Sequence, residues 1–121
     1  MFYFGGITGL DDKKVTVDTS TTNGVVDIDC DKSSFYEIDI SGDTTININN
    51  LDNGSLNIIA LIVKNGGNSA ITWPSDIKWV GPQGSMFMDW GNLGITLKTD
   101  GSDDFIIIWS DGVNKYARVM R

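Results

Sequence analysis

The sequence has no histidine, one cysteine, one glutamate and no long apolar run. Without histidine the chain lacks the commonest general base and the commonest metal-binding side chain. Cys30 has no second cysteine to pair with, so neither an intrachain disulfide nor a cysteine zinc site can form. The longest apolar stretch, Leu56 to Val63, is interrupted by Asn57 and is too short to cross a membrane. These absences argue against a metalloenzyme and against a membrane protein.

Positive charge is also scarce, with nine Lys and Arg against sixteen Asp and Glu and a net charge of −7. An acidic surface repels the phosphates of nucleic acids. The basic residues form no long run, although Lys115, Arg118 and Arg121 cluster near the end. We therefore expect no nucleic-acid partner. All acids except Glu37 are Asp, which favours turns over helix interiors.

The 121 residues, 40% of them hydrophobic, suffice for one domain with its own core. The first residues are aromatic and glycine-rich and lack the basic flank of a secretory signal, so we expect assembly in the cytoplasm. We divide the chain into residues 1–10, an apolar arm or first strand, and residues 11–121, the folded domain. The residues that would make the arm an assembly anchor are Phe2, Tyr3, Phe4 and Ile7.

Apolar and polar residues alternate along most of the remaining chain, which is typical of half-buried strands. The pattern predicts strands over residues 25–30, 35–40 and 44–50, with Ser41-Gly42-Asp43 as a hairpin turn between the last two. The nearly continuous apolar run at residues 56–63 predicts a central strand covered on both faces.

The C-terminal part continues in the same way. Residues 93–98 and 105–109 are predicted strands on either side of a turn at 99–103, and Asp111-Gly112 predicts a hairpin leading to a strand at 115–120. No window carries an apolar stripe with helical spacing over the length that a helix needs. The sequence therefore predicts a single all-β domain, an antiparallel β-sandwich of jelly-roll type.

The three alternating acids Asp27, Asp29 and Asp31 resemble the start of a calcium loop. Such a loop needs glycine at its sixth position and a bidentate acid at its twelfth, where this chain has Lys32 and Ile38. The acids are better explained as the solvated face of a strand. We expect neither a metal site nor a cofactor.

Two further groups could be imagined as catalytic. Asp100, Asp103 and Asp104 surround a turn, where acids are usually solvated, and nothing in their surroundings argues for a raised pKa. Cys30 would need an activating base to act as a nucleophile and lies in a strand pattern that suits a small core residue. We therefore expect no enzymatic activity and name no catalytic residue.

Four tryptophans are the most prominent remaining feature. Trp73, Pro74 and Trp79 form a proline turn bracketed by two indoles, which predicts a fixed structural corner. We expect Trp109, at the end of an apolar strand, to be buried, and Trp90, beside Asp89, to be exposed as a ligand or interface aromatic. Exposed tryptophans on a β-sandwich can stack on sugar rings, so a carbohydrate-binding module is an alternative to a purely structural protein.

The stretch from Trp73 to Trp79 and the features around it, over residues 36–116, resemble a module found in tailed-bacteriophage fibres and decoration proteins. Such modules carry a "WPS-x-I-x-W" stretch before a terminal hairpin that reads "DG-x-x-W/Y". Here Asp111 to Tyr116 fits that hairpin with one extra residue. The "GG-x-x-P" that usually follows the corner is replaced by residues 80–84, Val-Gly-Pro-Gln-Gly.

The resemblance implies a structural component of a phage virion, at the tip of a tail fibre, in a head fibre or on the capsid, often as a trimer. At this length the resemblance favours a surface subunit attached to the capsid or tail, which acts through contacts with other virion proteins. The alternative is a receptor-binding or glycan-binding module at a fibre tip.

Overall fold

The structure of the protein, a computed structural model, describes residues 14–51, 57–81, 89–93 and 95–120. These residues form strands and short 3₁₀ turns, and no α-helix occurs among them. The all-β prediction is confirmed. The strands are β1 (Val15–Asp18), β2 (Val25–Asp29), β3 (Phe35–Asp39), β4 (Thr44–Asn49), β5 (Asn57–Lys64), β6 (Ile71–Thr72), β7 (Ile77–Trp79), β8 (Asp103–Ser110) and β9 (Lys115–Val119).

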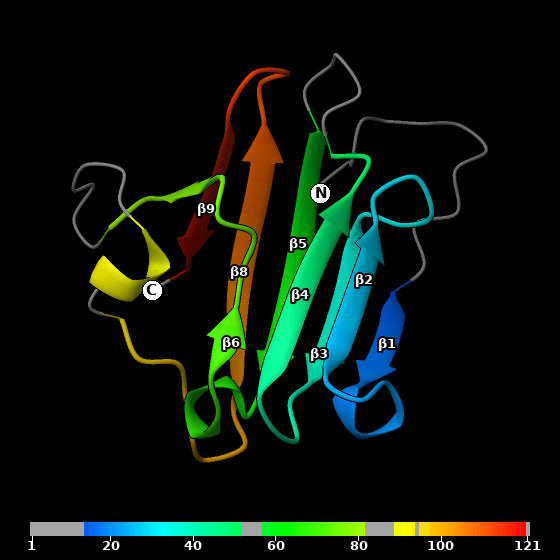
Figure 1. The fold of residues 1–121 in the computed structure, drawn as a ribbon, viewed down its shortest axis with the longest axis vertical. Coiled ribbons are helices and arrows are strands. Elements are labelled where there is room, and N and C mark those ends of the chain that lie inside the picture. Colours follow the sequence, from blue (N-terminus) through cyan, green and yellow to red (C-terminus); the bar gives the residue numbers. More distant parts are fainter. Residues whose placement is uncertain (1–13, 52–56, 82–88, 94, 121) are drawn as a thin grey trace.

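The strands form two sheets that lie one over the other (Figure 1). The larger sheet has the order β1-β3-β5-β8-β9-β7, and the smaller one the order β2-β4-β6. From β1 to β6 the chain alternates between the two sheets. Each of these strands pairs in parallel with the strand two places along the chain: β1 with β3, β2 with β4, β3 with β5 and β4 with β6. We call the described residues from 15 to 51 and from 57 to 72 the parallel coil.

The prediction of antiparallel pairing is wrong for the parallel coil, and a jelly-roll topology is not confirmed. Among the strands of the described residues, five pairings are parallel, and β5–β8 and β8–β9 are antiparallel. The predicted hairpin at Ser41-Gly42-Asp43 instead carries the chain from one sheet to the other, because β3 and β4 belong to different sheets. The hydroxyl of Thr19 from the preceding coil turn accepts the Ser41 N–H at 2.9 Å, which holds this crossing in place.

The two C-terminal predictions have different outcomes. The Asp111-Gly112 hairpin is confirmed: it joins β8 to β9, and the Asp111 N–H donates to the Asn114 carbonyl at 3.2 Å. The strand predicted at residues 93–98 is wrong, because the described residues of this segment form no strand. Their backbone groups bond elsewhere: Lys98 donates its N–H to the Asp104 carboxylate at 2.7 Å and accepts from Gly67 at 3.1 Å.

The core lies between the sheets and follows the alternation of the sequence. Alternate residues of β2, β3 and β4 are buried, among them Ile28, Ile38 and Ile46, and Ile48 at the end of β4 is partly buried. In β5 the consecutive residues 59–61 are all buried, so its outer face is buried at Ala60, whereas Ile58, Ile62 and Lys64 on that face are only partly buried. It lies between β3 and β8 in the larger sheet, which confirms the predicted central position but not the predicted full cover on both faces.

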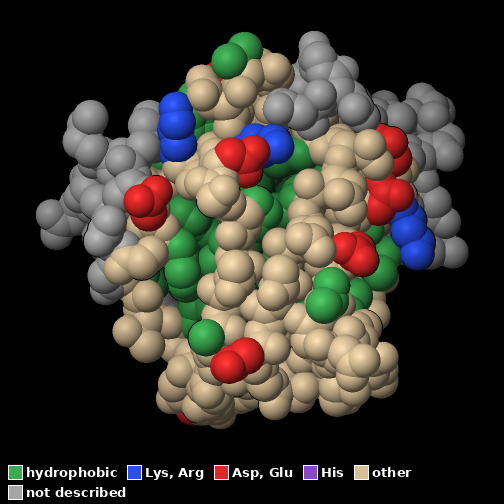
Figure 2. Space-filling view, in the orientation of Figure 1, with side chains coloured by type: hydrophobic (Ala, Val, Ile, Leu, Met, Phe, Trp, Pro, Cys, Tyr) green, Lys and Arg blue, Asp and Glu red, His purple; other side chains and the backbone are tan. Residues whose placement is uncertain are grey.

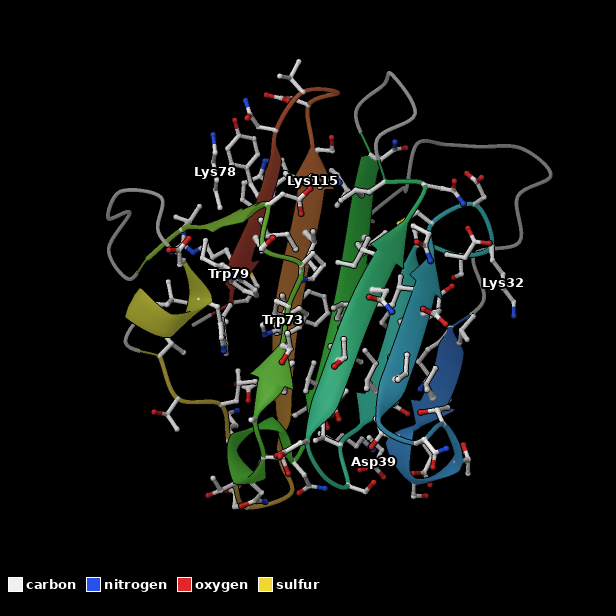
Figure 3. All side chains as sticks on the ribbon, in the orientation of Figure 1. Lys32, Asp39, Trp73, Lys78, Trp79 and Lys115 are labelled. Carbon is white, nitrogen blue, oxygen red and sulfur yellow. The ribbon has the colours of Figure 1, made fainter. Side chains whose placement is uncertain are left out.

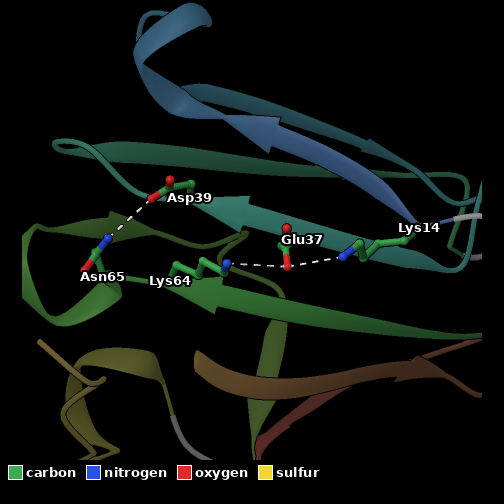
Figure 4. A network of polar contacts seen from close by, with 5 residues as sticks. All are labelled: Lys14, Glu37, Asp39, Lys64 and Asn65. Carbon is green, nitrogen blue, oxygen red and sulfur yellow. Dashed lines mark hydrogen bonds and ion pairs between the residues drawn. The ribbon is translucent and has the colours of Figure 1, made fainter. Parts of the chain in front are cut away.

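The outer side of the larger sheet carries a small charged network around the only glutamate (Figure 4). The Glu37 carboxylate lies 3.3 Å from the Lys14 ammonium and 3.9 Å from that of Lys64. Both lysines are well exposed, so such pairs contribute about 0–1 kcal/mol each. Glu37 lies on β3, Lys64 ends β5 and Lys14 directly precedes β1, so the network links three neighbouring parts of the larger sheet.

The apolar arm proposed at residues 1–10, with Phe2, Tyr3, Phe4 and Ile7, lies outside the described residues. Within the described part of the chain, no helix is long and apolar enough to cross a membrane.

Candidate functional site

The tryptophan corner is formed at the junction between β6 and β7. Trp73 directly follows β6 and Trp79 ends β7, and both are buried, with 7% and 1% of their surfaces exposed. The turn between them closes with the Ile77 N–H donating to the Pro74 carbonyl at 3.3 Å. The two indoles meet edge to face with centroids 5.1 Å apart, side by side in Figure 3. This arrangement suits aromatic pairs because ring edges are positive and faces negative.

A third indole joins them from a segment far along the chain. Trp90 begins the 3₁₀ turn η4 (Trp90–Asn92), and its ring centroid lies 4.5 Å from Trp79 and 5.7 Å from Trp73. Its polar neighbours in the sequence led us to expect an exposed side chain, whereas Trp90 is partly buried. Trp109, expected in the core, is also partly exposed and stacks on Tyr116 across the β8–β9 pair.

A hollow of about 400 Å³ opens beside the three indoles, and we call it the tryptophan hollow. Hydroxyls of Thr72 and Ser75 and the carboxylate of Asp89 are exposed polar groups on its wall. The Nε1 atom of Trp73 is buried and has no hydrogen-bond partner within the described part of the chain. The remaining described residues of the wall are Ile71, Trp73, Pro74, Ile77, Trp79, Trp90 and Gly91.

A second hollow of about 360 Å³ lies on the other side of the Pro74 to Ile77 turn, against β2 and β4. Four of its polar side chains form two pairs. The Lys115 ammonium lies 2.9 Å from the Asp76 carboxylate, and the Asn47 amide donates to Asp27 at 2.9 Å. Figure 2 shows this face, where hydrophobic side chains appear in recesses bordered by scattered acidic and basic groups.

Two of the three acids that resembled a calcium loop accept hydrogen bonds from asparagines of β4 or the residue after it. Asn47 donates to Asp27, and Asn50 donates to Asp29 at 2.9 Å. The Asn50 amide and the Asp31 N–H lower the pKa of Asp29. Among the described residues no group of three or more His, Cys, Asp or Glu side chains is arranged to hold a metal ion.

The acids at the 99–103 turn also have structural roles. Asp100 accepts the N–H of Ser102 at 3.0 Å, which lowers its pKa. Asp104 is buried and accepts the Lys98 N–H, whereas Asp103 is exposed at the start of β8. The structure therefore places these three acids in different environments, and Asp100 carries a pKa shift opposite to that of a general acid at neutral pH.

Cys30 is partly buried at the end of β2. Burial, assisted by the charges of Asp29 and Asp31, raises the pKa of its thiol to about 12. A nucleophilic cysteine needs the opposite shift.

The association of Trp90 with the corner could not be predicted from the sequence, because the alternation pattern covers strands only and Trp90 lies in a turn. A scan of protein-family models, a search of curated proteins and a search of solved structures each found no match to this chain.

Proposed function

We propose that the protein is a non-enzymatic structural subunit of a tailed-phage virion, attached to the surface of the capsid or tail. The observation that carries this proposal is the packing of Trp73, Trp79 and Trp90 into one cluster. Buried aromatic surface of this size contributes mainly to cohesion. The cluster joins the end of the parallel coil, where Trp73 follows β6, to β7 and the η4 turn, and a surface protein under mechanical load would need such links.

The ionisable groups support a structural role. A general acid at neutral pH needs a raised pKa, and an activated thiol needs a lowered one. The shifts found here have the opposite directions, because hydrogen bonds lower the carboxyl pKa values and burial raises that of the Cys30 thiol. The carboxyl groups with lowered pKa values are Asp18, Asp29, Asp100 and Asp111.

The sheet edges support assembly into an oligomer, for which we propose a homotrimer. β1 and β2 are the first strands in their sheets and have no outer neighbour within the described part of the chain. Free strand edges are templates for pairing with another chain. The side chain of Val25 on β2 is 42% exposed, so the edge also presents apolar surface. The acidic surface keeps the free subunit soluble.

Mass spectrometry and cryo-electron microscopy of purified particles test the proposal. We expect the protein in stoichiometric amounts relative to the major capsid or tail protein, with density on the particle surface. Purified particles that lack the protein would overturn the virion assignment.

The oligomer is tested separately by light scattering after size exclusion. Val25→Lys places a charge on the β2 edge and should shift a trimer towards monomer. Val113→Lys is the matched control, since Val113 is 81% exposed in the β8–β9 loop and should leave the mass unchanged. A monomeric wild-type protein would contradict the proposed trimer.

A further inference from the structure

We propose that the outer face of the larger sheet, which is the side turned away from the smaller sheet, pairs with the same face of a second copy of this chain. This pairing goes beyond the proposed function and is separate from the proposed trimer, which uses strand edges. The outer face has three features that support pairing: a continuous apolar surface, opposite charges at its two sides, and sufficient area.

The apolar surface is the first feature. Residues 105–109 of β8 are all apolar, so this strand presents apolar side chains on both faces of the sheet. The apolar residues of the outer face that are partly or well exposed include Ile58, Ile62, Phe105, Ile107, Trp109 and Met120. None of these six belongs to the core between the sheets, and Phe105 and Met120 are 41% and 51% exposed. Exposed apolar patches of this kind mark interaction sites.

The strand registers place these side chains next to one another. Ile62 on β5 lies opposite Phe105 on β8, and Ile58 lies opposite Trp109. Trp109 in turn stacks on Tyr116 of β9, with ring centroids 5.6 Å apart. The apolar surface therefore continues across three adjacent strands.

Opposite charges at the two sides of the apolar surface are the second feature. On the β3 side the Glu37 carboxylate lies beside Lys14 and Lys64 (Figure 4). On the β9 side Arg118 is partly exposed and lies opposite Ile107. A contact that exchanges the two sides between copies therefore places Arg118 of one copy near Glu37 of the other. The presence of both signs of charge also limits the repulsion between two chains of charge −7.

A twofold axis parallel to the strands, between β5 and β8, makes this exchange. Phe35, Ala60, Ile107 and Arg118 form one row across the larger sheet. The axis places Ile107 of one copy over the small side chain of Ala60 in the other. It also places Arg118 over the Phe35 ring, which favours a cation–π contact, and Glu37 lies two residues further along the same strand. Face-to-face sheets pack in this way, with strand directions within about 30° of each other.

The area is the third feature. The five strands from β1 to β9, spaced about 4.8 Å apart, and the eight residues of β8, at about 3.3 Å each, give a face of roughly 600 Å². Two copies would then bury about 1,200 Å² in total, which is the lower end of the range for stable interfaces. We therefore expect a dissociation constant in the micromolar range.

Analytical ultracentrifugation of the full chain, from about 1 μM to about 1 mM, tests the pairing across that range. We expect the weight-average mass at high concentration to reach at least twice the mass at low concentration. Over the same range the indole N–H signal of Trp109, on the outer face, should shift in nuclear magnetic resonance spectra. That of Trp79, which is 1% exposed inside the molecule, should stay in place.

Variants assign the pairing to the outer face. Phe105→Lys places a charge within the apolar surface and should weaken association at least tenfold. Val113→Lys is the matched control, because it adds the same charge in the β8–β9 loop, where Val113 is 81% exposed, and should leave association unchanged. The Trp109 signal is measured on the wild-type protein, so it keeps the test valid even if Phe105→Lys folds poorly.

A charge exchange tests the twofold axis. Arg118→Glu and Glu37→Arg should each weaken pairing about threefold, because each places like charges opposite one another across the axis. The double variant restores opposite charges and should pair about as well as the wild-type protein.

Three results would overturn the proposal: a mass that stays constant up to about 1 mM, equal association in Phe105→Lys and Val113→Lys, or a double variant that pairs no better than Arg118→Glu alone. The proposed trimer is judged from the mass at low concentration, and the virion assignment from purified particles. Failure of the pairing is therefore distinguishable from failure of either.

Discussion

The Tyr36 hydroxyl forms hydrogen bonds with both backbone groups of Asp29: it donates to the Asp29 carbonyl at 2.9 Å and accepts the Asp29 N–H at 3.2 Å. Tyr36 lies on β3 of the larger sheet and Asp29 ends β2 of the smaller one, so a single side chain links the two sheets. The ring is buried, with 2% of its surface exposed. The phenol therefore takes the place of a ladder partner at the point where β2 ends.

Tyr36→Phe should lower the free energy of unfolding by about 1–3 kcal/mol, because it leaves both an N–H and a carbonyl of Asp29 without this partner. Urea unfolding followed by circular dichroism measures the loss. Tyr116→Phe is the control, since its hydroxyl reaches the exposed Asp111 carboxylate only at 3.4 Å. Equal losses in the two variants would contradict the special role of Tyr36.

Stability should fall in alkaline solution. The thiol pKa of Cys30 rises from 9.0 to about 12 on folding, chiefly by burial, and the pKa of Tyr36 rises above 10.0 for the same first reason. Both groups favour the folded state while protonated. Their contribution is complete below pH 9.0 and is lost as the pH rises towards about 12, because the unfolded chain ionises first.

Cys30→Ala checks this assignment. Urea midpoints measured across the same pH range should decline less steeply in the variant than in the wild-type protein. Parallel curves would show that the thiol does not contribute to the alkaline loss.

Trp79→Ala should cost about 3–5 kcal/mol, because it empties a fully buried position in contact with two other indoles. Trp109→Ala should cost less, since Trp109 is partly exposed and stacks on Tyr116 alone among the described rings. Thermal unfolding ranks the two variants. A larger loss for Trp109→Ala would contradict the cluster as the main source of cohesion.

Much of the strand content could be predicted from alternation, because a half-buried strand needs apolar residues at every second position, as Val26 and Ile28 show. The same alternation arises in parallel and antiparallel strands, so the pairing direction could not be derived from it. The pairing partners in the coil are 20 to 27 residues apart, from Val26 with Ile46 to Thr44 with Ile71, a spacing expected for a coil. No residue-level repeat marks that spacing in the sequence.

The candidate site was only partly predictable for a similar reason. Trp73 and Trp79 are close in the chain, and the proline turn between them predicts their approach. Trp90 lies in a turn that has no strand periodicity, so its contact with the other two indoles depends on the tertiary structure alone. The unpaired Nε1 of Trp73 depends on the positions of all neighbouring acceptors, which no local pattern contains.

Gly67→Ala should destabilise the protein by about 1–3 kcal/mol, in the range of overpacked positions. Gly67 lies in the 3₁₀ turn η2 (Gly66–Asn68), and its N–H donates to Lys98, which ties the turn to the segment before β8. A methyl group there would lie 2.8 Å from the Leu97 carbonyl carbon and 2.7 Å from Thr99 Cγ2. The backbone of Leu97 cannot yield as a flexible side chain would, so the segment has to move.

Gly42→Ala provides the matched control, because a methyl group at Gly42 meets no atom within 4 Å and the residue lies in the crossing between β3 and β4. Its stability should stay within about 0.5 kcal/mol of the wild-type protein, as for ordinary surface changes. Chemical denaturation compares the two, and hydrogen exchange at the Gly67 amide reports the local contact. If Gly67→Ala proved as stable as Gly42→Ala, the 95–99 segment would not be packed against η2 as described. The burial of Leu97 in the core would then have to depend on other contacts.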